Sequence, residues 1–326
     1  MTDFSHQNDN QNLLGSESNN DFYLSDVSPK DKLWDKHKLE AIKLAALYLD
    51  SEFFIKYGER TRNCVQSLLF AFQANDQGET FLRLHAASFC RVRHCPVCQW
   101  RRSLMWRSRF LQGLEQLLLD YPSSKFIFLT LTVKNCEINQ LKATLNQMNS
   151  AWKRLIQRKS WPAEGFVRST EITRSKIGEA HPHFHCLFQV PASYFSGGYI
   201  SQVEWTNLWK SCLKVEYTPV VNVKRVKTTG SALPPENLKK AVCETLKYSV
   251  KESDLIADGQ WLYELTTQLH NTRAVALGGV FRDYFSDNEP EDLIHVEPNE
   301  EEELEIASPQ KVLFNWKSSV KRYIKK

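Results

Sequence analysis

Residues 181–190, HPHFHCLFQV, alternate in the period of two that is typical of a β-strand. His181, His183 and His185 share one face of this strand, and three apolar side chains share the other: Phe184, Cys186 and Phe188. The apolar face can be buried against helices. Buried imidazoles without partners would each cost about 1–3 kcal/mol, so the histidine face needs a partner.

A divalent metal ion would be such a partner, because His183 and His185 can both point a ring nitrogen at one ion. Residues 164–173 form a second expected strand, joined to the histidine strand as a hairpin. Glu171 is the preferred third ligand, since a carboxylate suits a hard divalent ion, and His181 is the alternative. Without a metal, the histidines would be exposed or hydrogen-bonded to neighbours.

The remaining pattern predicts strands separated by helices. Strands are expected at 125–135 and 218–227, and helices at 34–57, 103–121, 141–155 and 236–253, with a capping box formed by Ser201 and Glu204 before another helix. We therefore expect an α+β fold, with a central, mainly antiparallel sheet flanked by helices.

Four parts of the chain are expected. They are a disordered polar tail (1–30), a helical and Cys-rich DNA-binding region (31–120), a catalytic domain (121–284), and an acidic linker with a basic C-terminal tail (285–326).

The expected helix 236–253 carries Glu244 and Tyr248 four residues apart, and therefore on one face. Lys240, Lys247 and Lys251 flank them. One interpretation is an ordinary solvated helix face. The other is a tyrosine nucleophile, because nearby cations lower the pKa of a phenol and a metal ion polarises a phosphate.

Cys90, Cys95 and Cys98 form a tight cluster, CRVRHCPVC, and with Cys64 they would supply four thiolates for a structural zinc ion. His94 or His85 could replace Cys64, and reduced buried thiols are the alternative to zinc. Residues 91–110 contain no acid and six arginines, interleaved with aromatic side chains, which is typical of a surface for DNA. The arginines are Arg91, Arg93, Arg101, Arg102, Arg107 and Arg109.

The net charge of +4 hides an asymmetry. Residues 287–305 hold ten acidic residues and no Lys or Arg, which leaves 42 basic and 28 acidic residues elsewhere. A basic body suits a polyanion such as nucleic acid. The sequence shows no signal peptide and no membrane-spanning run, so we expect a cytoplasmic protein without a membrane partner.

Three motifs occur in order: FLTLTV (128–133), HPHFHCL (181–187) and ETLKYSVK (244–251). Together they resemble the motifs of plasmid rolling-circle replication initiators, the Rep proteins of the single-tyrosine branch of the HUH endonuclease superfamily. The resemblance implies the RRM-like palm of that superfamily. It also implies Mg²⁺ or Mn²⁺ on His183 and His185, and a Tyr248 nucleophile that nicks one strand and becomes linked to the 5′-phosphate. Glu244 would then admit water at termination.

The same resemblance implies plasmid origin DNA as the partner, single-stranded or in a hairpin at the nick, together with the host helicase and DNA polymerase. Other classes stay open at this point. A relaxase or single-strand transposase would use the same site, and a zinc-knuckle DNA-binding protein would use only the cysteines and arginines. A metal hydrolase would need the histidines but not Tyr248.

Overall fold

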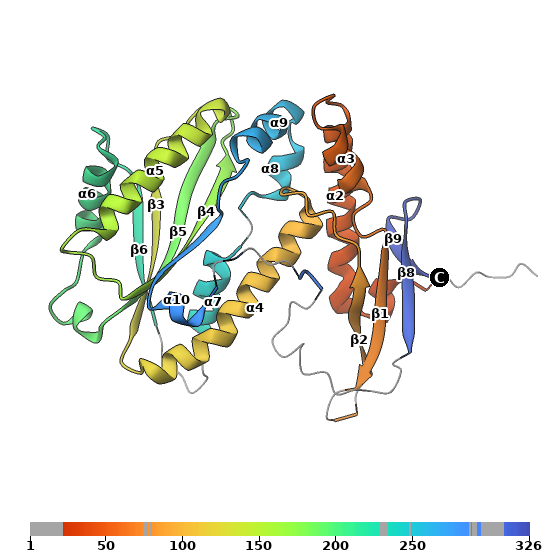
Figure 1. Ribbon diagram of the computed structural model, residues 1–326, viewed down its shortest axis with the longest axis horizontal. Helices are drawn as coiled ribbons and strands as arrows, with labels where there is room; N and C mark the ends of the chain where they lie inside the picture. The colour runs from red at the N-terminus through yellow and green to blue at the C-terminus, as the bar shows by residue number, and fades with distance from the viewer. Residues whose placement is uncertain are drawn as a thin grey trace, which may run out of the picture.

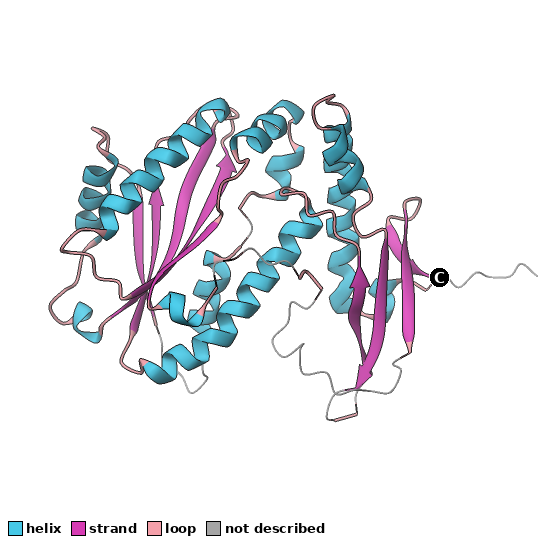
Figure 2. Ribbon diagram, in the orientation of Figure 1, coloured by secondary structure: helices cyan, strands magenta, loops and turns pink. Residues whose placement is uncertain are grey.

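The computed structural model describes residues 22–74, 77–78, 80–227, 234–247, 249–286, 288, 292–294 and 310–326. These residues build two antiparallel sheets with helices packed around them (Figures 1 and 2). The α+β prediction is therefore confirmed. Within these residues, no helix is both long enough and apolar enough to cross a membrane.

The larger sheet has five strands in the order β6-β3-β5-β4-β7, and every neighbouring pair is antiparallel. The strands are β3 (Lys125–Thr132), β4 (Gly165–Arg174), β5 (Ala180–Val190), β6 (Val221–Val226) and β7 (Val275–Gly279). The expected hairpin is β4–β5, which pairs over the whole length of β4. This sheet carries the histidine strand at its centre (Figure 1).

Helices cover both faces of this sheet. The apolar face of β5 packs against α5 (Leu141–Ile156) and α6 (Gln202–Leu213). On the other face, α4 (Pro96–Asp120) and α7 (Glu236–Thr245) pack against side chains such as Val167 and Leu187. The capping box of Ser201 and Glu204 opens α6 as expected.

The smaller sheet pairs two strands from the first third of the chain with two strands near its C-terminal end. Its order is β2-β1-β8-β9, from β1 (Ser67–Ala74), β2 (Thr80–Ala87), β8 (Lys311–Lys317) and β9 (Arg322–Lys325). It packs with α2 (Leu33–Leu49), beside which lies α3 (Ile55–Arg62) (Figure 1). The residues expected to form a basic C-terminal tail are thus two strands, held by pairing with β1 and burial of Phe314 and Tyr323.

Other sequence expectations need correction. The expected tail 1–30 includes α1 (Leu24–Val27) and the start of the 3-10 helix η1 (Pro29–Lys32), while residues 1–21 lie outside the described part. The expected helix 34–57 is two helices, α2 and α3. Helix α4 begins at Pro96 rather than near Ser103, because a proline fits the first turn of a helix. Most of the acidic segment 287–305 also lies outside the described residues.

The expected helix 236–253 is wrong beyond Thr245, where α7 ends. The Thr245 hydroxyl bonds back to the carbonyl of Ala241, and the chain then pairs with the edge of β4. There the Ile172 amide donates to the Ser249 carbonyl, and Val250 is fully buried. Tertiary pairing therefore replaces the helix over this stretch.

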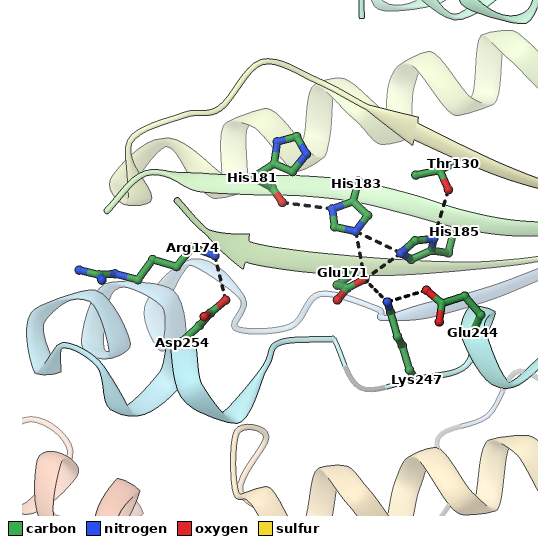
Figure 3. A network of polar contacts seen from close by, with 9 residues as sticks. All are labelled: Thr130, Glu171, Arg174, His181, His183, His185, Glu244, Lys247 and Asp254. Carbon is green, nitrogen blue, oxygen red and sulfur yellow. Dashed lines mark hydrogen bonds and ion pairs between the residues drawn. The ribbon is translucent and has the colours of Figure 1, made fainter. Parts of the chain in front are cut away.

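Four short helical elements and α9 complete the described fold. They are η2 (Ile138–Gln140), η3 (Ala192–Phe195), α8 (Glu252–Ile256), α9 (Gly259–Gln268) and α10 (Phe281–Tyr284). Helix α8 is fixed to the end of β4, since the Arg174 amide donates to Asp254 Oδ2 at 3.0 Å (Figure 3).

Candidate functional site

The register of the β4–β5 hairpin places Glu171 directly opposite His183. Glu171 Oε2 lies 3.0 Å from His183 Nε2 and 2.7 Å from His185 Nε2, and the two Nε2 atoms are 3.1 Å apart (Figure 3). All three side chains are buried. Their ligand atoms lie within 4.8 Å of one another, close enough to share one metal ion. We call these three residues the Glu171 cluster.

The far sides of both imidazoles have their own partners. His183 Nδ1 donates to the His181 carbonyl at 3.3 Å. His185 Nδ1 lies 3.4 Å from Thr130 Oγ1, on the neighbouring strand β3 (Figure 3). Such contacts fix ring orientation, so each ring keeps Nε2 directed at the centre of the cluster. The donor set, two imidazoles and a carboxylate, fits a divalent ion such as Mn²⁺ or Mg²⁺.

Lys247 is the fourth member of this polar network. Its Nζ lies 2.9 Å from Glu171 Oε2 and 2.7 Å from Glu244 Oε1 (Figure 3). Burial alone would raise the pKa of Glu171, but hydrogen bonds from His183, His185 and Lys247 outweigh it and hold that pKa well below its usual range. Burial lowers the pKa of Lys247, and the bonds to Glu244 and Glu171 more than reverse this. The site therefore holds a carboxylate and an ammonium group at neutral pH.

His181 lies apart from this group. Its Nδ1 is 2.8 Å from Asn135 Oδ1, and it does not belong to the ligand group that the described residues form. Between the two third ligands expected from the sequence, the geometry brings Glu171 to the histidine pair.

Tyr248 lies outside the described residues, but the chain on both sides of it lies at the Glu171 cluster. Lys247 contacts Glu171, while Ser249 and Val250 pair with Ile172, the next residue of β4. Lys251 lines a groove of about 550 Å³ together with Glu171 and Lys247. Lys240 belongs to α7 and is not among the residues that line this groove.

The four cysteines also converge. Cys64, Cys90, Cys95 and Cys98 have their Sγ atoms within 4.8 Å of one another, and Cys98 Sγ lies 3.7 Å from both Cys64 Sγ and Cys90 Sγ. The fully buried Lys38 donates to the Cys64 carbonyl at 2.6 Å. Four cysteines at this spacing could bind a tetrahedral zinc ion as thiolates.

The two histidines considered as substitutes for Cys64 lie outside this cluster. His94 is fully buried, its ring nitrogens have no hydrogen-bond partner among the described residues, and burial lowers its pKa to about 3. His85 is exposed on β2. Cys64 is the fourth member of the group, as preferred from the sequence.

The six arginines have different surroundings. Arg101 is buried, stacks against Trp34 and Trp100, and donates to the Leu293 and Ile294 carbonyls. Four others also donate to backbone carbonyls: Arg93 to Leu269 and Thr272, Arg102 to Arg91 and Arg93, Arg107 to Cys243, and Arg109 to Asn288. Arg91, Arg93 and Arg102 line a cavity of about 320 Å³ that also contains Lys247.

Two residues were missed by reasoning from the sequence. Thr130 orients His185, and its signal was present in the alternating FLTLT pattern, which places it on the histidine face of β3. Lys38 lies beneath the cysteines, and a lysine in an amphipathic helix gives no sequence signal of burial.

Known proteins resemble this chain over most of its length. A family model described as "Replication protein" matches residues 81–324. A "Protein rep" from Streptococcus pneumoniae serotype 2 is 33% identical over 91% of this chain and 93% of its own length. Proteins of the same name from Lentilactobacillus hilgardii (34% identical; 92% and 98% of the two chains) and Bacillus amyloliquefaciens (32%; 95% and 99%) are similar. No solved structure matches. The chain therefore belongs to the replication-protein family.

Proposed function

We propose that this replication protein initiates rolling-circle replication of a plasmid by nicking one strand of the origin with Tyr248. The observation that carries the proposal is the Glu171 cluster, linked through Lys247 to the chain on both sides of Tyr248. Family membership supports a role in replication, and the cluster supports phosphoryl chemistry rather than DNA binding alone.

The proposed reaction is a phosphoryl transfer. The Tyr248 oxygen forms a bond to the scissile phosphorus as the phenol loses its proton, and the phosphorus–O3′ bond breaks. The 5′-phosphate stays on Tyr248, and the departing O3′ takes up a proton as the 3′-OH primer. A divalent ion held by Glu171, His183 and His185 would neutralise charge on the phosphate. Lys247 places a further positive charge beside it.

A nicking assay tests this proposal. Purified protein, Mn²⁺ and supercoiled plasmid carrying its origin should give open circles and a protein–DNA adduct that survives denaturation in detergent. A relaxase or transposase would give the same adduct. Replacing the plasmid's double-strand origin with an unrelated sequence should therefore abolish both the adduct and plasmid replication in cells. A shifted band without any cut would contradict the proposal and favour a zinc-knuckle binding protein.

Glu244 has a separate expected role, which is to activate the water that releases the strand at termination. Its carboxylate contacts Lys247 at the Glu171 cluster and is half exposed, so water can reach it. Glu244→Ala should nick at nearly the normal rate but accumulate products longer than one plasmid unit. Gel analysis of replication products measures this, with Glu236→Ala, at the start of α7, as control. Normal unit-length products would remove Glu244 from the mechanism.

We also propose that the four cysteines hold a structural zinc ion. Elemental analysis of purified protein should give about one equivalent of zinc. Cys98→Ser should lose it, together with several kcal/mol of stability, because metal binding in such sites contributes to the free energy of folding. Cys212→Ser, at a buried cysteine of α6, is the control that should keep the zinc. Zinc-free protein with an unchanged melting temperature would contradict the proposal.

Two further partners belong to the same proposal. A 3′-OH at a nicked origin is a primer for a host DNA polymerase, and the strand ahead of it must be unwound by a host helicase. Adding both proteins to the nicking reaction should give DNA synthesis that depends on the nick.

A further inference from the structure

Arg168 is a buried cation that the proposed chemistry does not use. It lies on β4, three residues before Glu171, and its side chain projects from the opposite face of the sheet. Only 8% of the residue is exposed, and its guanidinium lies over the Phe184 ring at 4.0 Å and the Trp152 ring at 5.1 Å. Burial lowers its pKa to about 10, so it remains charged at neutral pH.

The hydrogen-bonding capacity of this guanidinium is not satisfied within the described residues. Nε and Nη1 of Arg168 are both buried and have no hydrogen-bond partner there, and no carboxylate of the described residues forms an ion pair with it. The aromatic rings interact with the charge but accept no hydrogen bond of normal strength. A buried unpaired charge is costly, so its persistence indicates a ligand that supplies the missing acceptors.

A cavity of about 300 Å³ adjoins Arg168. We call it the Arg168 cavity, and nine of its lining residues have polar side chains, among them Arg93, Arg168, Arg273, Asn149, Thr170 and Ser249. Its described lining contains no Asp or Glu. Arginine, amide and hydroxyl groups together present several hydrogen-bond donors without a negative charge, which suits a phosphate group.

The Arg168 cavity also adjoins the site of the proposed chemistry. Arg93, Thr170 and Ser249 line both this cavity and the 320 Å³ cavity that contains Lys247. Ser249 follows Tyr248 in the chain, and Thr170 precedes Glu171. A strand of DNA passing from one of these cavities to the other would therefore meet arginine side chains in both.

We infer that the Arg168 cavity binds a phosphate group, and that this phosphate belongs to the DNA strand on which the Glu171 cluster acts. The second half of the inference rests on the proposed nicking function, while the first half does not. Arg168 would donate N–H groups of its guanidinium to the phosphate oxygens.

The test is a melting-temperature titration of the full chain without added divalent ion, so that no cleavage takes place. Inorganic phosphate should raise the melting temperature of the wild type in a saturable way, because a ligand of the folded state stabilises it. Arg168→Met keeps the apolar stem against Phe184 and should weaken phosphate binding about tenfold or more, the effect of one charge-assisted hydrogen bond. Arg158→Met, at a surface arginine bonded to Ser211, is the matched control and should bind normally.

A second pair of probes distinguishes the sources of the phosphate. A thymidine dinucleotide should also stabilise the wild type, and its uncharged methylphosphonate counterpart should not. A response to inorganic phosphate alone would keep the anion site and overturn the assignment to DNA. No response to either probe, or an equal response in Arg168→Met, would overturn the whole inference.

A second variant at the same cavity keeps the test decisive if Arg168→Met does not fold. Asn149 is a half-buried residue of α5 that lines the cavity. Asn149→Ala should fold and show a reduced phosphate response. An unchanged response in that variant would contradict the proposed lining. Because these measurements involve no cut DNA, loss of phosphate binding and loss of nicking are separate outcomes.

Discussion

Tyr248→Phe should abolish the detergent-resistant protein–DNA adduct and reduce nicking by on the order of a thousandfold or more. The substitution removes only the oxygen that would bond to phosphorus. Lys247 can still contact Glu171, and Ser249 and Val250 can still pair with β4, because none of these contacts uses the phenol. The measurement is adduct formation on supercoiled origin plasmid with Mn²⁺.

The matched control is Tyr284→Phe, which removes a tyrosine hydroxyl bonded to Asp120 on the surface. It should nick at the normal rate. Cleavage that survives Tyr248→Phe would support a metal hydrolase instead, in which water rather than a phenol attacks the phosphate.

Glu171→Gln should have the second largest effect, a loss of roughly a hundredfold or more in nicking. The amide keeps the size of the side chain but removes the charge to which His183, His185 and Lys247 all bond. The required Mn²⁺ concentration should rise as well, because an anionic ligand is lost. Nicking rates across a Mn²⁺ titration separate the two effects.

His181→Ala is the control for that experiment, since His181 is a histidine of the same strand that lies outside the ligand group. It should retain nearly normal nicking and an unchanged Mn²⁺ requirement. If His181→Ala loses activity while Glu171→Gln keeps it, the third ligand is misassigned.

The sequence predicted the parts of the site that depend on local periodicity. The alternation in residues 181–190 gave a strand with a histidine face and an apolar face, and the hairpin placed Glu171 beside the histidines. These features follow from strand geometry and from a short connection, so they need no knowledge of the rest of the fold.

Features set by distant parts of the chain could not be predicted in this way. Helix α7 ends at Thr245 because Ser249 and Val250 pair with β4, a contact that helix periodicity does not reveal. Strand β8 pairs with β1 more than 200 residues earlier, so its sequence resembled a charged tail. The burial of Lys38 and Arg168 depends on neighbours from several elements, and neither was expected. The division into a DNA-binding region and a catalytic domain and the roles of the site residues stay predictions.

The most direct test is anomalous X-ray diffraction from crystals grown with Mn²⁺ and an origin oligonucleotide. The account predicts a Mn²⁺ peak about 2.0–2.3 Å from Glu171 Oε2, His183 Nε2 and His185 Nε2. It also predicts the Tyr248 oxygen within about 3.5 Å of a phosphorus bound to that ion. Mn²⁺ held elsewhere, or a Tyr248 oxygen too distant to reach the bound phosphate, would contradict it.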